Sequence, residues 1–248
     1  MHEGQGYRVA DMLADIEKGF SSLSPEQQTE VLELHDHRFP NEENQSHLLT
    51  IFRSNAYNSG DGHIGLFPKC ARINHSCRPN CLNFWSEKTS KRIIYAGKDI
   101  EKGEEIIVSY IPLLKAIKQR QERLQQYGFT CSCSACQSSE SSKRRVKIAE
   151  ALESLEQKVH STSTKTALIE KRISKALALI EMIEEEGLTD YSARAFHLAA
   201  VFNKQNGNLK VARELAVKEL EIHQWAELDS AEALTTLEFI AGLGLEAE

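Results

Sequence analysis

The cysteines of this chain constrain its fold more than any other feature. Three of them lie within six residues, directly after a segment whose pattern predicts the end of a helix: Cys131, Cys133 and Cys136. Three thiolates at this spacing are one ligand short of a closed tetrahedral zinc site, so a fourth must come from elsewhere in the chain. The stretch INHSCRPNC, residues 73–81, offers Cys77 and Cys81. A shared zinc ion would therefore join two segments that are far apart in the sequence.

The composition argues against several classes of protein. The chain has 248 residues, 41% of them hydrophobic, which is enough for one core and a second small domain. Its 30 basic and 36 acidic residues form no long basic stripe, so we expect no direct binding of nucleic acid. No segment approaches the roughly 20 apolar residues of a membrane span, and the start lacks a signal-peptide pattern. We therefore expect an intracellular protein of the nucleus or cytoplasm, where six cysteines are more typical of metal ligands or free thiols than of disulfides.

The residue pattern changes along the chain and predicts four segments. Residues 1–54 are mainly helical, and Ser24-Pro25 has the pattern of a helix start. Short β-prone runs follow, CLNFW, RIIYA and EIIVSY, separated by turn-rich pieces. A helix predicted from Pro112 to Gly128 then precedes the cysteine cluster. The predicted boundaries are 1–54, 55–111, 112–137 and 138–248.

The last segment is predicted to be entirely helical. QSSESSKRR, residues 137–145, has the composition of a linker, and KRRVK within and after it is either a nuclear address or a solvated helix start. An apolar stripe at helical spacing follows: Ile169, Ile173, Leu177, Ile180 and Ile183. Residues 193–223 have the length of a tetratricopeptide hairpin, although a plain helical bundle is the favoured interpretation.

Three motifs together carry a resemblance to a known family. NHSCRPN (74–80), GEEIIVSY (103–110) and YGFTCSCSAC (127–136) resemble the C-terminal half of a SET domain with its post-SET cysteines, as in SET-MYND and fungal SET-domain proteins. The resemblance implies an α+β fold: a β-rich SET-like core with a zinc cluster, followed by an all-α C-terminal domain. It also implies transfer of a methyl group from S-adenosylmethionine to a protein lysine, on a histone or non-histone substrate.

The resemblance assigns roles to individual residues. Tyr110 matches the catalytic tyrosine, whose hydroxyl orients an in-line methyl transfer. Asn80 matches a residue that supports the threaded crossing of this fold, and Tyr57 and Tyr127 match walls of the lysine channel. The implied cofactor-binding residues are Asn55, Ala71, Ile73, Asn74, His75, Tyr127 and Phe129. The implied zinc ligands are Cys77, Cys131, Cys133 and Cys136, with Cys81 as the alternative to Cys77.

The chain also departs from the family pattern. The glycine-rich turn that opens a SET domain is expected to be missing, because Gly4-Gln5-Gly6 is followed by a helix-like segment. No MYND-like cysteine and histidine cluster is present in the sequence. Two functions are therefore expected: a lysine methyltransferase that lacks the N-terminal part of its SET domain, or an inactive zinc-stabilised module for protein interaction.

Overall fold

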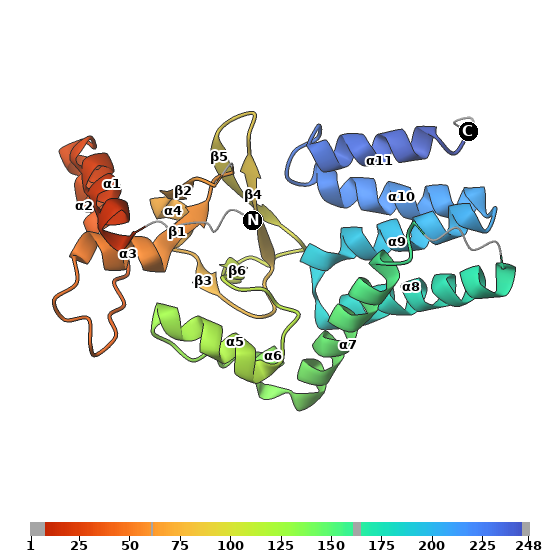
Figure 1. Cartoon of the computed structure of the whole chain (residues 1–248), viewed down its shortest axis with the longest axis horizontal. Coiled ribbons are helices and arrows are strands. Elements are labelled where there is room, and N and C mark those ends of the chain that lie inside the picture. The colour runs from red at the N-terminus through yellow and green to blue at the C-terminus, as the bar shows by residue number, and fades with distance from the viewer. Residues whose placement is uncertain (1–7, 61, 161–164, 245–248) are drawn as a thin grey trace. The chain divides into compact units, whose positions relative to one another are not determined.

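The computed structural model describes residues 8–60, 62–160 and 165–244 and divides the chain into two compact units (Figure 1). The first unit contains the chain up to Asn74 together with Leu124–Thr130. The second contains His75–Arg123 and the chain from Cys131 onward. Gly4-Gln5-Gly6, which was not expected to form the glycine-rich turn of a SET domain, lies outside the described residues.

The first unit is mainly helical, as predicted. Its elements are α1 (Val9–Ser21), α2 (Pro25–Leu32), α3 (His47–Asn55), the strands β1 (Ala56–Asn58) and β2 (Ile64–Leu66), and α4 (Pro68–Ala71). The predicted helix start at Ser24 is confirmed, because its hydroxyl accepts a bond from the Gln27 N–H in a capping box. Val31 and Ile51 form the centre of a small apolar core between these helices.

Three short strands of the second unit follow the predicted β-prone runs. The strands β4 (Cys81–Ser86) and β5 (Lys91–Ala96) form an antiparallel hairpin in which Cys81 lies opposite Ala96. The predicted run 105–110 contributes only β6 (Ile107–Val108), whose neighbour in the sheet is β3 (Asn74–His75); the second unit begins at the second residue of β3. The Ser76 N–H donates to the Val108 carbonyl at 3.0 Å. The stretch NHSCRPN (residues 74–80), named the NHSC segment from here on, therefore runs beside β6.

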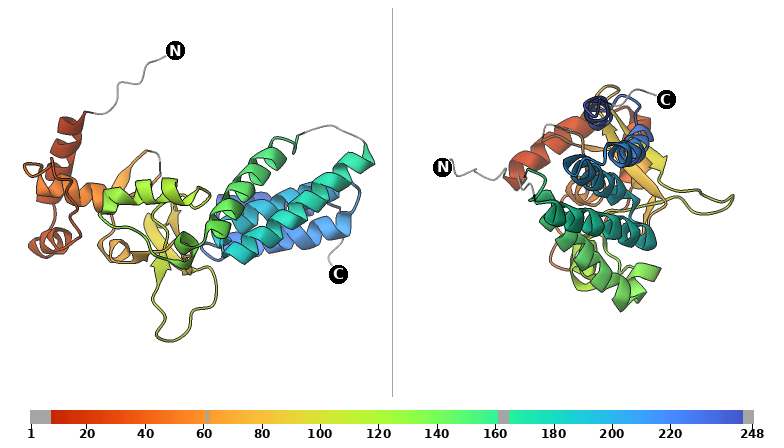
Figure 2. Two further views of the ribbon diagram at one scale, coloured as in Figure 1. Left: turned by 90° about the horizontal axis from the view of Figure 1, so that it is seen from below. Right: turned by 90° about the vertical axis from the view of Figure 1, so that its right-hand side faces the viewer.

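The rest of the second unit is helical. Its helices are α5 (Ile117–Leu124), α6 (Ser134–Gln137), α7 (Ser139–Glu156), α8 (Thr166–Glu186), α9 (Ser192–Gln205), α10 (Leu209–Gln224) and α11 (Ala231–Ala241). Figures 1 and 2 show α8 to α11 lying side by side, and each helix from α7 to α10 contacts the next helix in the sequence. Among the described residues, no helix combines the length and the apolar character that crossing a membrane requires.

Two sequence predictions in this region were wrong. The helix predicted from Pro112 begins instead at Ile117, because backbone groups ahead of it bind elsewhere: the Leu113 N–H donates to the Tyr191 hydroxyl. The predicted linker 137–145 is largely helix α7, which Ser138 caps by accepting a bond from the Ser141 N–H. Serine and charged residues in this stretch face other elements as well as solvent, which composition alone does not reveal.

The predicted stripe of α8 is correct at three positions. Ile169, Ile180 and Ile183 are buried, whereas Leu177 is 42% exposed. The buried face instead continues through Ala176, Leu179 and, after Ile183, through a charged residue at the end of the helix, Glu186.

Candidate functional site

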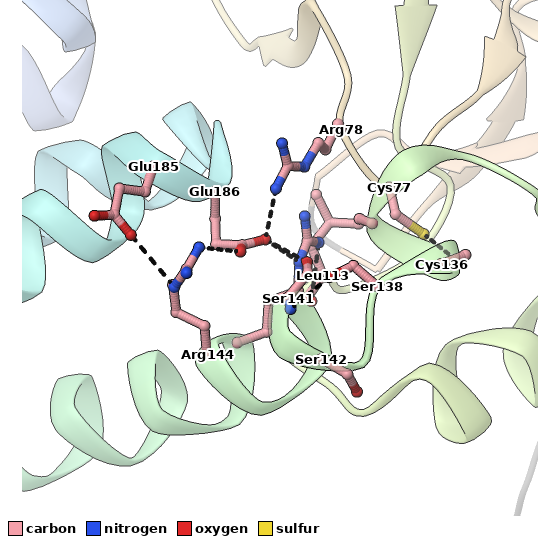
Figure 3. Close-up of polar contacts among 12 residues, drawn as sticks. Cys77, Arg78, Leu113, Cys136, Ser138, Ser141, Ser142, Arg144, Glu185 and Glu186 are labelled. Carbon is pink, nitrogen blue, oxygen red and sulfur yellow. Dashed lines mark hydrogen bonds and ion pairs between the residues drawn. The ribbon is translucent and has the colours of Figure 1, made fainter.

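Four cysteines of the second unit form a compact cluster. The Sγ atoms of Cys77, Cys131, Cys133 and Cys136 all lie within 4.8 Å of one another. The Cys77 and Cys136 sulfurs are 3.6 Å apart (Figure 3). A tetrahedral zinc ion with bonds of ~2.3 Å holds its sulfurs about 3.8 Å apart, so this donor set fits zinc in both chemistry and spacing. Cys81, the alternative predicted ligand, is buried at the start of β4 and does not belong to this four-sulfur cluster.

The sequence around the cluster explains why the three late cysteines converge. The Gln121 side chain of α5 makes two hydrogen bonds to the backbone of Cys131. Its Nε2 donates to the Cys131 carbonyl at 2.7 Å, and its Oε1 accepts from the Cys131 N–H at 3.0 Å. The chain then turns into the single-turn helix α6, and the Cys136 N–H donates to the Cys133 carbonyl at 2.9 Å. This turn brings the Cys133 and Cys136 sulfurs to the same side of the backbone.

The thiols influence one another electrostatically. A hydrogen bond from Cys77 lowers the pKa of Cys133 to about 3, and the same hydrogen bond raises the pKa of Cys77. Burial raises the pKa of Cys131 to about 11. Without metal, negative charge therefore concentrates on Cys133, and a divalent cation would release the remaining thiol protons.

His75 links this cluster to Tyr110, the predicted catalytic residue. The backbone N–H of Tyr110 donates to His75 Nδ1 at 3.0 Å, which assigns the ring proton to Nε2. That Nε2 lies 3.4 Å from the Cys77 sulfur and donates toward it. Burial lowers the pKa of His75 to about 4, so the ring is neutral near pH 7 and keeps this arrangement. One imidazole therefore positions both a predicted zinc ligand and the residue predicted to orient methyl transfer.

Asn80 fixes the other end of the same segment. Its buried amide Nδ2 donates to the Glu105 carbonyl at 2.8 Å and to Glu104 Oε1 at 3.0 Å. Its Oδ1 accepts the Ile107 N–H at 2.8 Å. Three side-chain bonds from one residue hold the chain before β4 against the chain entering β6, in agreement with the supporting role that the resemblance implied.

We expect Asn80→Ala to lower the free energy of unfolding by about 3 kcal/mol, because it leaves the Glu105 carbonyl and the Ile107 N–H without their buried partner. For a chain of this size that is a fall in Tm of about 6–12 °C in calorimetry. Asn83→Ala is the matched control: Asn83 is exposed on β4, and its loss should cost within about 0.5 kcal/mol. Equal shifts for the two variants would contradict this account of Asn80.

The other predicted site residues belong to the first unit. The Asn55 amide donates to the carbonyls of His35 and Ile51, both at 2.7 Å, and so holds the loop before α3 against that helix. The Tyr57 hydroxyl donates to the Cys70 carbonyl at 3.3 Å. The remaining predicted residues lie in or after α4, in β3, and around the turn at Gly128: Ala71, Ile73, Asn74, Tyr127 and Phe129. Their roles in cofactor binding stay predictions.

The turn that carries Tyr127 and Phe129 depends on a glycine. Gly128 has φ +80°, and a Cβ at this position would collide with the His37 ring. On the other side of the turn, His35 Nε2 donates to the Tyr127 carbonyl at 3.0 Å. Two histidines of the long loop after α2 therefore hold the turn that separates α5 from the cysteine cluster.

Sequence reasoning missed Arg120 and Gln121, which contact the cluster from α5. Arg120 is 1% exposed, and its Nη2 lies 3.7 Å from the Cys136 sulfur. A signal was present: Arg120 follows Ile117 by three residues on the face of α5 that carries apolar side chains. A charged residue at an apolar position of a helix predicts a buried partner.

Comparison with known families agrees with the sequence motifs. Residues 14–111 match the SET domain family, and this match confirms the predicted resemblance. The matched range ends one residue after Tyr110 and includes the whole segment from His75 to Asn80.

Curated relatives are also similar over parts of this chain. It is 33% identical over 135 residues to histone-lysine N-methyltransferase set5 of Schizosaccharomyces pombe, covering 53% of this chain and 41% of that protein. It is 40% identical over 89 residues to N-lysine methyltransferase SMYD2 of Gallus gallus, covering 35% of this chain and 20% of that protein. It is 37% identical over 75 residues to histone-lysine N-methyltransferase SMYD3 of Homo sapiens, covering 30% and 17%. The chain therefore spans less than half the length of each of these relatives.

Proposed function

We propose that this chain, whose residues 14–111 match the SET domain, acts in a protein-lysine N-methyltransferase that uses S-adenosylmethionine. The observation that carries the proposal is the bridge made by His75, which ties the Tyr110 backbone to the Cys77 sulfur. Relatives described as lysine methyltransferases in a fungus, a bird and a human support the reaction class. The substrate is a protein with a target lysine, on a histone or a non-histone protein.

In this proposal the residues of the chain position the reactants and do little acid or base chemistry. S-adenosylmethionine supplies a methyl group on a sulfonium, which a neutral amine can attack in line. The Tyr110 hydroxyl orients the incoming lysine, and removal of the lysine from water would favour its uncharged amine. The His75 ring has both nitrogens engaged, so we expect it to act by holding Tyr110 and the NHSC segment in place.

The same proposal includes a structural zinc ion. Cys77, Cys131, Cys133 and Cys136 would hold it, and the ion would lock the NHSC segment onto the chain after α5. Since all four positions of a tetrahedral ion are filled by sulfur, this zinc has a structural role and takes no part in methyl transfer.

Binding of S-adenosylmethionine by the full, zinc-loaded chain tests the proposal. Ligand-observed NMR detects weak as well as tight complexes, and we expect saturation transfer to the cofactor that Asn74→Ala abolishes. Asn83→Ala, on the exposed face of β4, is the matched control and should leave the signal unchanged. Absence of the signal in the zinc-loaded chain, or an equal signal in Asn74→Ala, would contradict the proposal.

A further inference from the structure

A buried cluster of charged side chains lies next to the cysteine cluster within the second unit. At its centre is Glu186, which is fully buried at the end of α8. Its Oε2 accepts from Arg145 Nε at 3.1 Å and from the Ser141 hydroxyl, and its Oε1 accepts from Arg144 Nη1 at 2.9 Å. Arg145 is also fully buried. Figure 3 shows Glu186 directed toward the first turns of α7.

The position of Glu186 is unfavourable without these partners. A carboxylate at the C-terminus of a helix faces the negative end of the helix dipole. Burial by itself would raise the pKa of Glu186, yet the bonds from Ser141 and Arg145 outweigh it and keep this pKa below its usual range. The helix ends directly afterwards, because Gly187 takes the left-handed conformation with φ +62°. The carboxylate is therefore held in place by the arginines it faces.

Glu186 also reaches the segment that carries the first predicted zinc ligand. Arg78 Nη2 lies 3.4 Å from Glu186 Oε2, and Arg78 directly follows Cys77. The Arg78 side chain is 37% exposed, so this ion pair is partly screened by water. Through it, the end of α8 contacts the NHSC segment, although more than one hundred residues separate them in the sequence.

The charges of this cluster do not balance on their own. The fully buried groups are two arginines, Arg120 and Arg145, against one carboxylate, Glu186. Arg78 and Arg144 add positive charge, and Glu185 offsets part of it through its ion pair with Arg144 at 3.3 Å. Within the described residues, Arg120 Nε and Arg145 Nη2 are buried without a hydrogen-bond acceptor. The region therefore has an excess of positive charge and of N–H donors.

A tetrathiolate zinc centre supplies the missing negative charge. Four thiolates around a divalent zinc ion carry a net charge of minus two, and their sulfurs accept hydrogen bonds. Four arginines and two glutamates leave an excess of two positive charges. Arg120 places its positive charge next to the cysteine cluster, because its Nη2 lies 3.7 Å from Cys136 Sγ. Its other hydrogen bonds go to the backbone carbonyls of Lys115 and Ala135, which carry no formal charge.

We infer that Arg120 is the buried counter-charge in contact with the zinc centre, that Arg145 and Arg78 add to this positive charge, and that Glu186 positions Arg145 and Arg78, so that zinc retention depends on the end of α8. The inference rests on the zinc site of the proposed function. It assigns Glu186 the role of positioning the arginines beside the zinc site, although helix α8 contributes none of the four cysteines. Outer-shell partners of this kind commonly change metal affinity by about 10- to 100-fold.

The test is zinc affinity of the full chain, measured by competition with a chromogenic chelator. We expect Glu186→Gln to weaken zinc binding by about 10- to 100-fold, because it removes the charge that holds the arginines while keeping the shape. Glu184→Gln is the matched control: it lies two residues earlier on the same helix, is exposed and is not part of the charge cluster, and it should change the affinity by less than about twofold. Equal affinities of Glu186→Gln and the wild type would overturn the inference.

A second variant keeps the test decisive if Glu186→Gln folds poorly. Arg78→Met removes the partly exposed partner, and we expect it to weaken zinc binding less than Glu186→Gln does. If both act through their ion pair, the double variant loses less affinity than the two single losses combined, whereas independent effects simply add. Additive losses would overturn the inference. A wild-type chain that binds no zinc would instead refute the zinc site of the proposed function. That outcome can be told apart from failure of the Glu186 inference, in which the wild type binds zinc and Glu186→Gln binds it equally well.

Discussion

Replacing Cys133 with serine should abolish stoichiometric zinc binding and strongly destabilise the second unit. A hydrogen bond from Cys77 lowers the pKa of Cys133 to about 3, so this sulfur is a thiolate near pH 7 and offers a negative charge to the metal. A serine hydroxyl stays protonated near neutral pH and is a poor zinc ligand. Loss of one of four ligands should weaken zinc affinity by more than the ~100-fold that marks the upper range for outer-shell partners. Elemental analysis after dialysis measures the result.

The control for this substitution is Cys70→Ser. Cys70 is a half-buried thiol of the first unit and does not belong to the four-sulfur cluster. We expect one zinc ion per chain in this variant, as in the wild type. Chelation should lower the Tm of the wild type and leave that of Cys133→Ser nearly unchanged, since the variant has no metal to lose. One zinc per chain in Cys133→Ser would show that this cysteine is not a ligand.

Tyr110→Phe should reduce methyl transfer by about 100-fold or more, because it removes the hydroxyl that, in the proposed function, orients the lysine in line with the methyl group. The substitution keeps the backbone N–H that His75 binds at 3.0 Å, so the local fold should be preserved. We therefore expect little change in Tm and little change in cofactor binding. The measurement is the initial rate of transfer of a labelled methyl group to protein, at saturating cofactor.

Tyr95→Phe is the matched control for this experiment. Tyr95 lies in β5 and, like Tyr110, is a partly buried tyrosine of the second unit. It is not among the predicted site residues, and its loss should change the rate by less than about threefold. A similar fall in rate for both variants would indicate a general effect of tyrosine loss on the fold.

The four-cysteine cluster could be predicted from the sequence because its geometry is largely local. Cys131, Cys133 and Cys136 are close in space since they are close in sequence, and a one-turn helix is enough to align two of them. The fourth cysteine of the cluster, Cys77, required a family resemblance, because the residue pattern alone left Cys81 equally open. The strands β4 and β5 were predictable for the same reason: each is a short β-prone run, CLNFW or RIIYA, and only a short turn separates them.

The buried charges could not be predicted, because their burial is decided by segments distant in the sequence. Arg145 lies in KRRVK and Glu186 in a run of three glutamates, and both runs have the composition of a solvated surface. Only the packing of α7 against α8 places the two side chains together. A faint signal existed in their spacing: Glu186 continues the buried positions of α8, as Glu219 continues those of α10. An acidic residue on the apolar face of a helix is a useful indication of a buried ion pair.

Tandem mass spectrometry of a protein acceptor, incubated with the zinc-loaded chain and S-adenosylmethionine, tests the central claim most directly. Core histones together with a mixture of non-histone proteins provide acceptors for either substrate class. The account predicts methyl groups on lysine side chains that depend on the cofactor and are nearly absent when Tyr110→Phe replaces the wild type. Methyl-lysine formed equally by Tyr110→Phe, or none formed by a zinc-loaded chain that binds the cofactor, would contradict it.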